Sequence, residues 1–165
     1  MESEAAYLST VENISYFSNE ALARFVSAQN RVVSKVICHL WVNKINPEQS
    51  MEIIDNIELL FQDQNKLTIS CNPEGTGLDA VDFDFDLSAR QLETEFDGKI
   101  KLYAIDASGT KMWSEVIGKT LKAVKLSRDN DHYKADSIVL DFDTERREIS
   151  IGPLDGLVID YYEDL

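Results

Sequence analysis

The stretch MEIIDNIELLFQDQNKLTISC, residues 51–71, decides the fold class of this chain. Its first half places Ile57, Leu59 and Phe61 at every second position, which is typical of a strand with one buried face. Polar residues 63–65 then turn the chain, and residues 66–71 return with β-branched and apolar side chains. The stretch therefore predicts an antiparallel β-hairpin.

A second hairpin of the same kind is predicted at IVLDFDTERREISI, residues 138–151. Its outgoing strand matches the outgoing strand of the first hairpin at an offset of 81 residues. Its return strand matches at an offset of 82, so that Ile151 corresponds to Ile69 and the second turn is expected to be longer by one residue. Short helix, strand, loop, hairpin, turn and strand thus occur twice, in pseudo-repeats at roughly 17–87 and 110–164. We interpret this order as an internal duplication, and the alternative is a chance likeness of two hairpins.

The remaining elements follow from periodicity and capping residues. Helices are expected within 9–29 with a cap at Ser18–Asn19, within 88–96 with Ser88 as cap, and within 112–119 closed by Gly118. Further strands are expected at 32–42, 81–87, 99–107, 121–126 and 157–162. The fold class is therefore α+β, with antiparallel sheets and short flanking helices. Because no Gly/Ser-rich or Pro-rich linker divides the chain, we expect one domain over residues 1–165, with the two repeats packed as one core.

Charge is the feature that bears most on function. Thirty acidic residues against sixteen basic ones give a net charge of −14, and residues 51–100 carry −9 of it. Such a charge repels bare nucleic acid and anionic lipid, and it speeds association with basic partners. The alternative is that the charge serves solubility alone.

The sharpest acidic motif is Asp82-Phe83-Asp84-Phe85-Asp86. On a strand, these three carboxylates project from one face and the apolar side chains from the other. A file of like charges is costly, so it either protects a sheet edge or serves as a docking surface for Lys and Arg of a partner. The second hairpin carries Asp141 and Asp143 at the equivalent places, and Glu163 and Asp164 extend the acidic theme.

Metal and catalytic sites are not expected. A calcium loop built on Asp82, Asp84, Asp86 and Glu93 would need glycine where Leu87 stands. His39 follows Cys38 on a strand, so their side chains point to opposite faces and cannot act together. The sequence contains no phosphate loop, dinucleotide fingerprint or nucleophile elbow. We therefore expect a protein that is not an enzyme and uses no cofactor.

The start of the chain lacks the basic and apolar stretches of a signal peptide, and no stretch is long and apolar enough to span a membrane. The two cysteines lie in apolar strands, where buried reduced thiols are expected. These features predict a cytoplasmic protein.

The second half resembles small acidic bacterial immunity proteins of polymorphic and contact-dependent toxin systems. The resemblance is carried by residues 116–119, by the hairpin at 138–151 and by Asp155-Gly156-Leu157-Val158-Ile159, over about 50 residues. It implies no catalytic residue. It implies an immunity protein that binds and neutralises a cognate basic toxin, such as a nuclease domain, through its acidic surface. The alternatives are a phage-type inhibitor that mimics nucleic acid, an enzyme with an unrecognised pocket, and an accessory domain without a dedicated partner.

Overall fold

The structure is a computed structural model that describes residues 14–152 and 155–163. Mixed α and β structure is confirmed, with strands predominating. The helices are α2 (Asn19–Ala28), α3 (Phe85–Glu95) and α4 (Lys111–Ser114), with a 3-10 turn at Pro47–Gln49. The strands are β1 (Val33–Asn43), β2 (Met51–Phe61), β3 (Lys66–Cys71), β4 (Leu78–Val81), β5 (Ile100–Asp106), β6 (Ala123–Asp129), β7 (His132–Asp141), β8 (Arg146–Gly152) and β9 (Gly156–Tyr161).

The nine strands of the described residues belong to one sheet, with the order β4-β3-β2-β9-β8-β7-β6; β1 pairs with β2 beside this path, and β5 pairs with β1. Every pairing is antiparallel except the junction of β2 with β9, which is parallel and rests on the pair Ile54–Gly156. This junction joins the two meanders of the chain, β2-β3-β4 and β7-β8-β9. The sheet is therefore continuous across both halves of the sequence.

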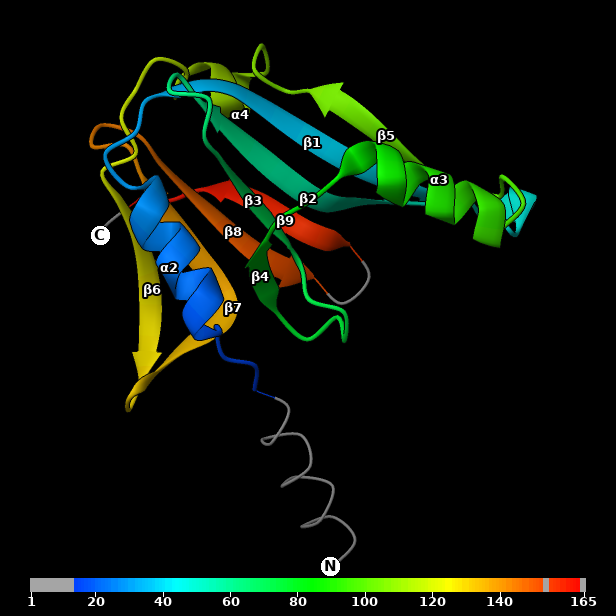
Figure 1. Cartoon of the computed structure of the whole chain (residues 1–165), viewed down its shortest axis with the longest axis horizontal. Coiled ribbons are helices and arrows are strands. Elements are labelled where there is room, and N and C mark those ends of the chain that lie inside the picture. The colour runs from blue at the N-terminus through cyan, green and yellow to red at the C-terminus, as the bar shows by residue number, and fades with distance from the viewer. Residues whose placement is uncertain (1–13, 153–154, 164–165) are drawn as a thin grey trace, which may run out of the picture.

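The sheet curls until its two ends approach one another (Figure 1). Strand β4 contacts β7, and α2 lies across the opening, where it contacts β3, β4 and β6. Gly77, just before β4, is packed so closely that an added Cβ would lie 3.0 Å from the carbonyl oxygen of Ala135 on β7. Ala21, Phe25 and Ala28 recur on one side of α2 and are buried inside the curl.

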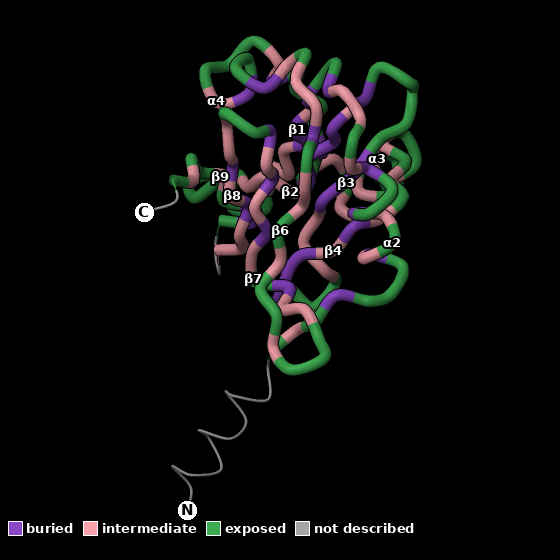
Figure 2. The backbone as a smooth tube through the Cα atoms, turned by 90° about the vertical axis from the view of Figure 1, so that its left-hand side faces the viewer, coloured by how far each residue is buried: buried purple, intermediate pink, exposed green. Residues whose placement is uncertain are grey.

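The hydrophobic core fills this curl and draws residues from both halves of the chain. Figure 2 shows the buried positions gathered along the strands, with the exposed ones at the loops and turns. Its fully buried branched side chains include Ile57, Leu59, Ile69, Ile138, Leu140 and Ile149, from β2, β3, β7 and β8.

Both predicted hairpins are present, but the second has a different register from the one predicted. Ile57 pairs with Ile69 in the first, and Ile138 pairs with Ile149 in the second, instead of Ile151. The second turn is thus one residue shorter than the first, because the Phe142 N–H already bonds to the Glu145 carbonyl, whereas the Phe61 N–H bonds to Asn65. Ile149 and Ile151 occupy the same face, so alternation alone did not distinguish them.

Several other elements differ from the sequence-based expectation. The strand expected at 81–87 ends at Val81, and the helix expected to begin after Ser88 begins at Phe85. A tight turn at 129–132 joins β6 to β7, and in it Asn130 adopts a φ of 55°. The helix expected within 112–119 spans only Lys111–Ser114, although Gly118 does adopt the positive φ of 84°. The part of the 9–29 helix before residue 14 lies outside the described residues.

Strands β1, β2 and β5 extend away from the curled part of the sheet, and α3 lies along them (Figure 1). We call this projection, residues 37–56 and 82–106, the arm. Its two faces differ: Cys38 and Leu40 of β1 lie on the side of the core, and His39 and Trp41 lie on the side covered by α3. The arm positions the most acidic part of the chain.

Candidate functional site

The acidic motif at 82–86 does not form a strand, which corrects the prediction that its aspartates line one face. Its first part is a connection after β4, and Asp84 is the N-cap of α3, with its Oδ1 accepting a hydrogen bond from the Leu87 N–H at 3.1 Å. Aspartate is a poor strand former and a favoured N-cap, because its carboxylate satisfies a backbone N–H that the helix leaves unpaired. Asp82, Asp84 and Asp86 therefore lie on a connection, a helix cap and a helix turn, and not along one strand.

The two phenylalanines of the motif fix it to the outer face of the sheet. The rings of Phe83 and Phe85 lie 4.9 and 5.1 Å from the ring of His39, measured between centroids, and Phe85 stacks on it. His39 belongs to β1 and is buried. Contact of these half-buried rings with His39 orients the start of α3, and the acidic side chains of the helix are exposed.

The helix and its flanks, residues 82–97, form what we call the acidic segment. Six carboxylates, those of Asp82, Asp84, Asp86, Glu93, Glu95 and Asp97, stand against the single cation Arg90, which gives a net charge of −5 over sixteen residues. No residue of α3 is fully buried, so the helix lies on the surface of the arm. The Asp82 side chain is 93% exposed, and its ion pair with Arg24 at 3.3 Å stabilises little at such exposure.

A buried polar cluster lies beneath this segment on the outer face of β1, β2 and β3. His39 Nδ1 and Asn56 Oδ1 are 2.6 Å apart, and Asn56 Nδ2 donates to Asp55 at 2.9 Å. Glu58 accepts hydrogen bonds from Thr68 and from Lys66, both at 3.3 Å. Sequence reasoning missed this cluster, because the polar positions of β2 alternate as those of a solvated face do.

Lys66 connects the cluster to the acidic segment. Its Nζ lies between the carboxylate of Glu58 and the carbonyl oxygen of Phe83, to which it donates at 3.1 Å. Buried polar groups are costly when unpaired, so these contacts favour the conformation in which the segment covers the sheet. The cluster thus holds the acidic segment in place.

Asp141 and Asp143 do not form a second file of outward carboxylates, because β7 ends at Asp141. The Asp141 side chain is 13% exposed, and its carboxylate pairs with Lys125 at 3.3 Å and with Arg146 at 3.6 Å. It also accepts the Asp143 N–H at 2.8 Å, which closes the turn. Asp141 is therefore engaged within the protein, while Asp143 is exposed at a φ of 78°.

The contacts of Asp141 predict a pH-dependent contribution to stability. Burial raises its pKa, but the Asp143 N–H and the charges of Lys125 and Arg146 outweigh burial and bring the pKa below its ordinary 3.8. A carboxyl with a lowered pKa stabilises the fold above its unfolded pKa, and this contribution is lost as the pH falls through the folded pKa. We expect Asp141→Asn to be less stable than the wild type in denaturant titrations at about pH 7, with the difference shrinking toward zero near pH 2. A difference that stays constant between these pH values contradicts this account.

The last described residues line a cavity of about 470 Å³ at the other end of the sheet from the arm's tip. Glu163 lines it together with Thr144, Arg146, Tyr161 and Tyr162. Glu163 is exposed, and Asp164 lies outside the described residues. The cavity is open and polar, and Thr144, which follows Asp143 in the chain, shares its lining with Glu163.

Arg147, beside this cavity, is fully buried, which sequence reasoning did not foresee. Its guanidinium donates to the Met112 carbonyl at 2.7 Å and to the Arg146 carbonyl at 2.8 Å. It pairs with Glu145 at 2.9 Å and Glu115 at 3.4 Å, and its central carbon lies 4.4 Å from the centroid of the Tyr161 ring. Arg147 thereby connects α4, the turn after β7 and the end of β9.

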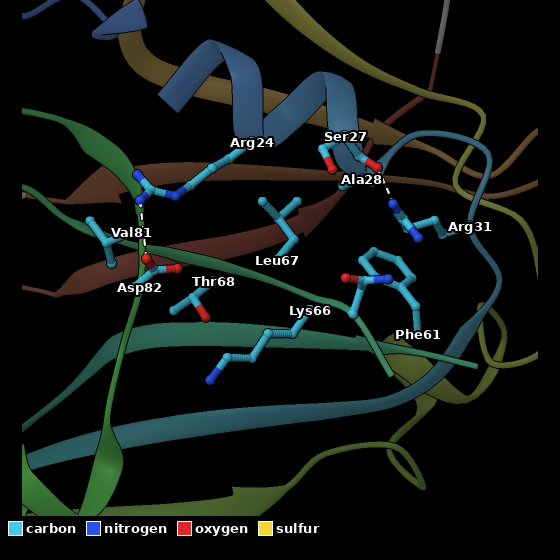
Figure 3. A pocket seen from close by; sticks show the side chains of 11 residues that line it. Arg24, Ser27, Ala28, Arg31, Phe61, Lys66, Leu67, Thr68, Val81 and Asp82 are labelled. Atoms are coloured by element: carbon cyan, nitrogen blue, oxygen red, sulfur yellow. Dashed lines mark hydrogen bonds and ion pairs between the residues drawn. The ribbon is translucent and has the colours of Figure 1, made fainter. Parts of the chain in front are cut away.

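A small hollow of about 90 Å³ between α2 and β3 gathers Arg24, Arg31 and Lys66 (Figure 3). The figure shows Arg24 and Arg31 at opposite ends of the hollow, with the side chain of Leu67 between them. Each cation already has partners: Arg24 pairs with Asp82, Arg31 with Asp63, and Lys66 with Glu58. Because the three cations do not converge, we regard the hollow as part of the packing of α2 against the sheet.

The described residues offer little to nucleophilic or metal chemistry. Burial raises the pKa of the Cys38 thiol to about 11, and burial with the nearby charge of Asp55 does the same for Cys71, so that neither is a ready thiolate. Over residues 14–152 and 155–163, no three His, Cys, Asp or Glu side chains come together in a group that could hold a metal ion. None of the helices in that part of the chain is both long and apolar enough to cross a membrane.

Comparison with known proteins adds no relative. No family model matches the chain, and neither a curated protein nor a solved structure is significantly similar to it.

Proposed function

We propose that this protein is an immunity protein that binds a basic toxin domain, such as a nuclease, through the acidic segment. One observation carries the proposal: the acidic segment, with a net charge of −5, lies on the surface of a projecting arm and is fixed from below by the half-buried rings of Phe83 and Phe85 and by polar contacts. In this proposal the protein acts in the cytoplasm, catalyses no reaction and needs no cofactor.

Electrostatics and apolar contact both support this use of the helix. A dense patch of one sign steers an oppositely charged partner and raises the association rate, and the effect weakens as salt screens it. Leu87 is an exposed apolar side chain among these charges, and it lines a shallow surface with Arg90, Gln91, Thr94 and Glu95. An apolar anchor within a charged rim is the usual anatomy of a protein interface.

The proposed contacts are therefore Asp82, Asp86, Glu93 and Glu95, with Asp143 and Glu163 as separate outlying candidates. Asp84 is a weaker candidate because its carboxylate caps α3, and Asp141 is a weaker one because two cations of the protein already pair with it. A partner would have to displace these internal contacts first, which lowers the net gain.

Neutralising the acidic segment is expected to abolish protection against the toxin. The test uses cells that express a basic toxin nuclease domain encoded beside this gene, together with wild type or a variant carrying Asp82→Asn, Asp86→Asn, Glu93→Gln and Glu95→Gln. We expect wild type to restore growth, and we expect the variant to bind at least about tenfold more weakly and to fail.

The matched control removes four exposed carboxylates elsewhere, with Glu20→Gln, Glu74→Gln, Asp131→Asn and Asp136→Asn. It changes the net charge by the same amount and is expected to protect like the wild type. Equal protection by both variants contradicts a role for the acidic segment. Loss of protection in both would show that overall charge, rather than this surface, matters.

We also infer that the chain arose by internal duplication. The order of elements supports this: α2 precedes β1, β2, β3 and β4, and α4 precedes β6, β7, β8 and β9. In each half the first two strands pair with a register shift, and the next pairing is a tight hairpin. Neither half closes the core alone, since α2 packs against strands of both.

A further inference from the structure

Strand β5 is an edge of the sheet within the part of the chain that the structure describes. It pairs antiparallel with β1 from Ile100–Asn43 to Asp106–Ile37, and with no other strand. Its second edge therefore presents backbone N–H and C=O groups that a further strand could pair with. Edge strands are usually short, charged or covered when they are not used.

Between the exposed charges of Lys101 and Asp106, the side chains of β5 are unusually apolar for an unused edge. Tyr103 and Ile105 lie on one face and are 43% and 44% exposed, and Ala104 between them is exposed on the other face. The three consecutive residues form an exposed apolar run at the open side of the arm. Solvent contact at this run is costly, and an added strand would bury it.

Helix α3 covers the opposite face of β5 and presents a charged flank there. Ser88, Gln91 and Leu92 line the cavity on the side of Trp41 and Asp55, which places this flank of the helix toward β1 and β2. Asp86 and Glu93 are seven residues apart, so they lie in one row along the helix, turned away from that flank. The helix packs on β5, and this row therefore lies toward the open edge.

We propose that the open edge of β5 and the row of Asp86 and Glu93 form one docking site for an extended basic segment of another protein. The segment pairs with β5 through its backbone. Its apolar side chains alternate onto Tyr103 and Ile105, and its Lys or Arg side chains alternate onto the face of Asp86 and Glu93. This inference rests on the proposed function, which requires a basic partner, and it specifies how that partner is held.

Electrostatics disfavours a second copy of this chain as the occupant. Two copies that pair antiparallel through β5 are related by a two-fold axis perpendicular to the sheet, which leaves both α3 helices on the same face. Two helical segments of −5 would then lie side by side and repel one another. A basic strand meets the same carboxylates with attraction.

The experiment uses the full chain and a synthetic peptide of about eight residues in which Lys and Val alternate, a length typical of one strand. A peptide of the same composition with all Lys before all Val is the control for charge alone. Binding is measured by fluorescence anisotropy, and the contact is located by hydrogen exchange of the β5 amides. We expect the alternating peptide to slow exchange across residues 100–106 and to bind about tenfold more tightly than the block peptide.

Two variants separate the two halves of the site. Ile105→Lys adds a cation at an exposed position and is expected to weaken binding about tenfold without unfolding the protein. The double variant Asp86→Asn, Glu93→Gln is also expected to bind the alternating peptide about tenfold more weakly, and its binding is expected to depend less on salt. The control variant Glu74→Gln, Asp136→Asn is expected to bind the peptide as the wild type does. Circular dichroism checks that each variant is folded.

Equal binding of both peptides, or binding that leaves β5 exchange unaltered, overturns the inference. A dimer of the free protein in sedimentation that Ile105→Lys dissociates also overturns it, since a second copy would then occupy the edge. A different experiment, the test of protection from the toxin, decides the proposed function. If neutralising the acidic segment abolishes protection from the toxin while β5 exchange is unchanged in the complex, the function stands and only this mode of docking is wrong.

Discussion

Replacing Gly156 with alanine is expected to lower the free energy of unfolding by about 3 kcal/mol or more. Gly156 adopts a φ of 68°, and a Cβ at this position would lie 2.5 Å from the carbonyl oxygen of Ile54 and 3.0 Å from the Cβ of Ile53. Both atoms belong to β2, and the carbonyl is backbone that cannot move alone. The substitution therefore acts on the junction of β2 and β9, which joins the two meanders.

Gly75 provides the matched control for this prediction. It has a similar φ of 70°, but nothing lies within 4 Å of its added Cβ. Gly75→Ala therefore costs only the backbone strain, about 1 kcal/mol. Denaturant titrations of both variants measure the difference, and equal losses contradict the view that close approach at the junction is what requires glycine.

Truncating Arg147 is expected to be nearly as damaging, with Arg147→Ala losing about 3 kcal/mol of unfolding free energy. The guanidinium is wholly buried, and it satisfies two backbone carbonyls and two carboxylates at once. Alanine leaves a cavity and removes all four contacts. The three elements that Arg147 connects then lose their common partner.

Arg147→Met separates packing from polar contact. Methionine fills a similar volume, so we expect its loss to be smaller than that of alanine by about 1–2 kcal/mol. Thermal and denaturant unfolding of the two variants measure this. An alanine variant within about 1 kcal/mol of the wild type contradicts a structural role for the buried guanidinium.

Local sequence patterns located both hairpins, since apolar positions alternate in each, but they gave the wrong register for the second. They failed at residues 82–87, where apolar and acidic residues alternate strictly but capping by Asp84 decides the outcome. A connection and a helix, instead of a strand, hold the half-buried rings of Phe83 and Phe85 against His39 there. Both structures bury the rings, so alternation alone did not distinguish them.

The candidate site was harder to foresee than the fold. The sequence indicates that residues 51–100 hold most of the charge, but Arg147 and Glu58 resemble ordinary surface charges in their local context. Their burial depends on partners far along the chain, such as Met112 and Thr68. No local pattern contains such contacts, so the polar cluster beneath the acidic segment and the internal pairing of Asp141 both required the structure.

The most direct measurement of the central claim is the dissociation constant of the complex with the basic toxin domain, determined by calorimetry between about 50 and 200 mM salt. We expect the wild type to lose affinity at least about tenfold over this range, and the variant neutralised at Asp82, Asp86, Glu93 and Glu95 to bind weakly with little salt dependence. Tight binding that is insensitive to salt, and equal in the two proteins, would contradict an acidic segment that binds the toxin.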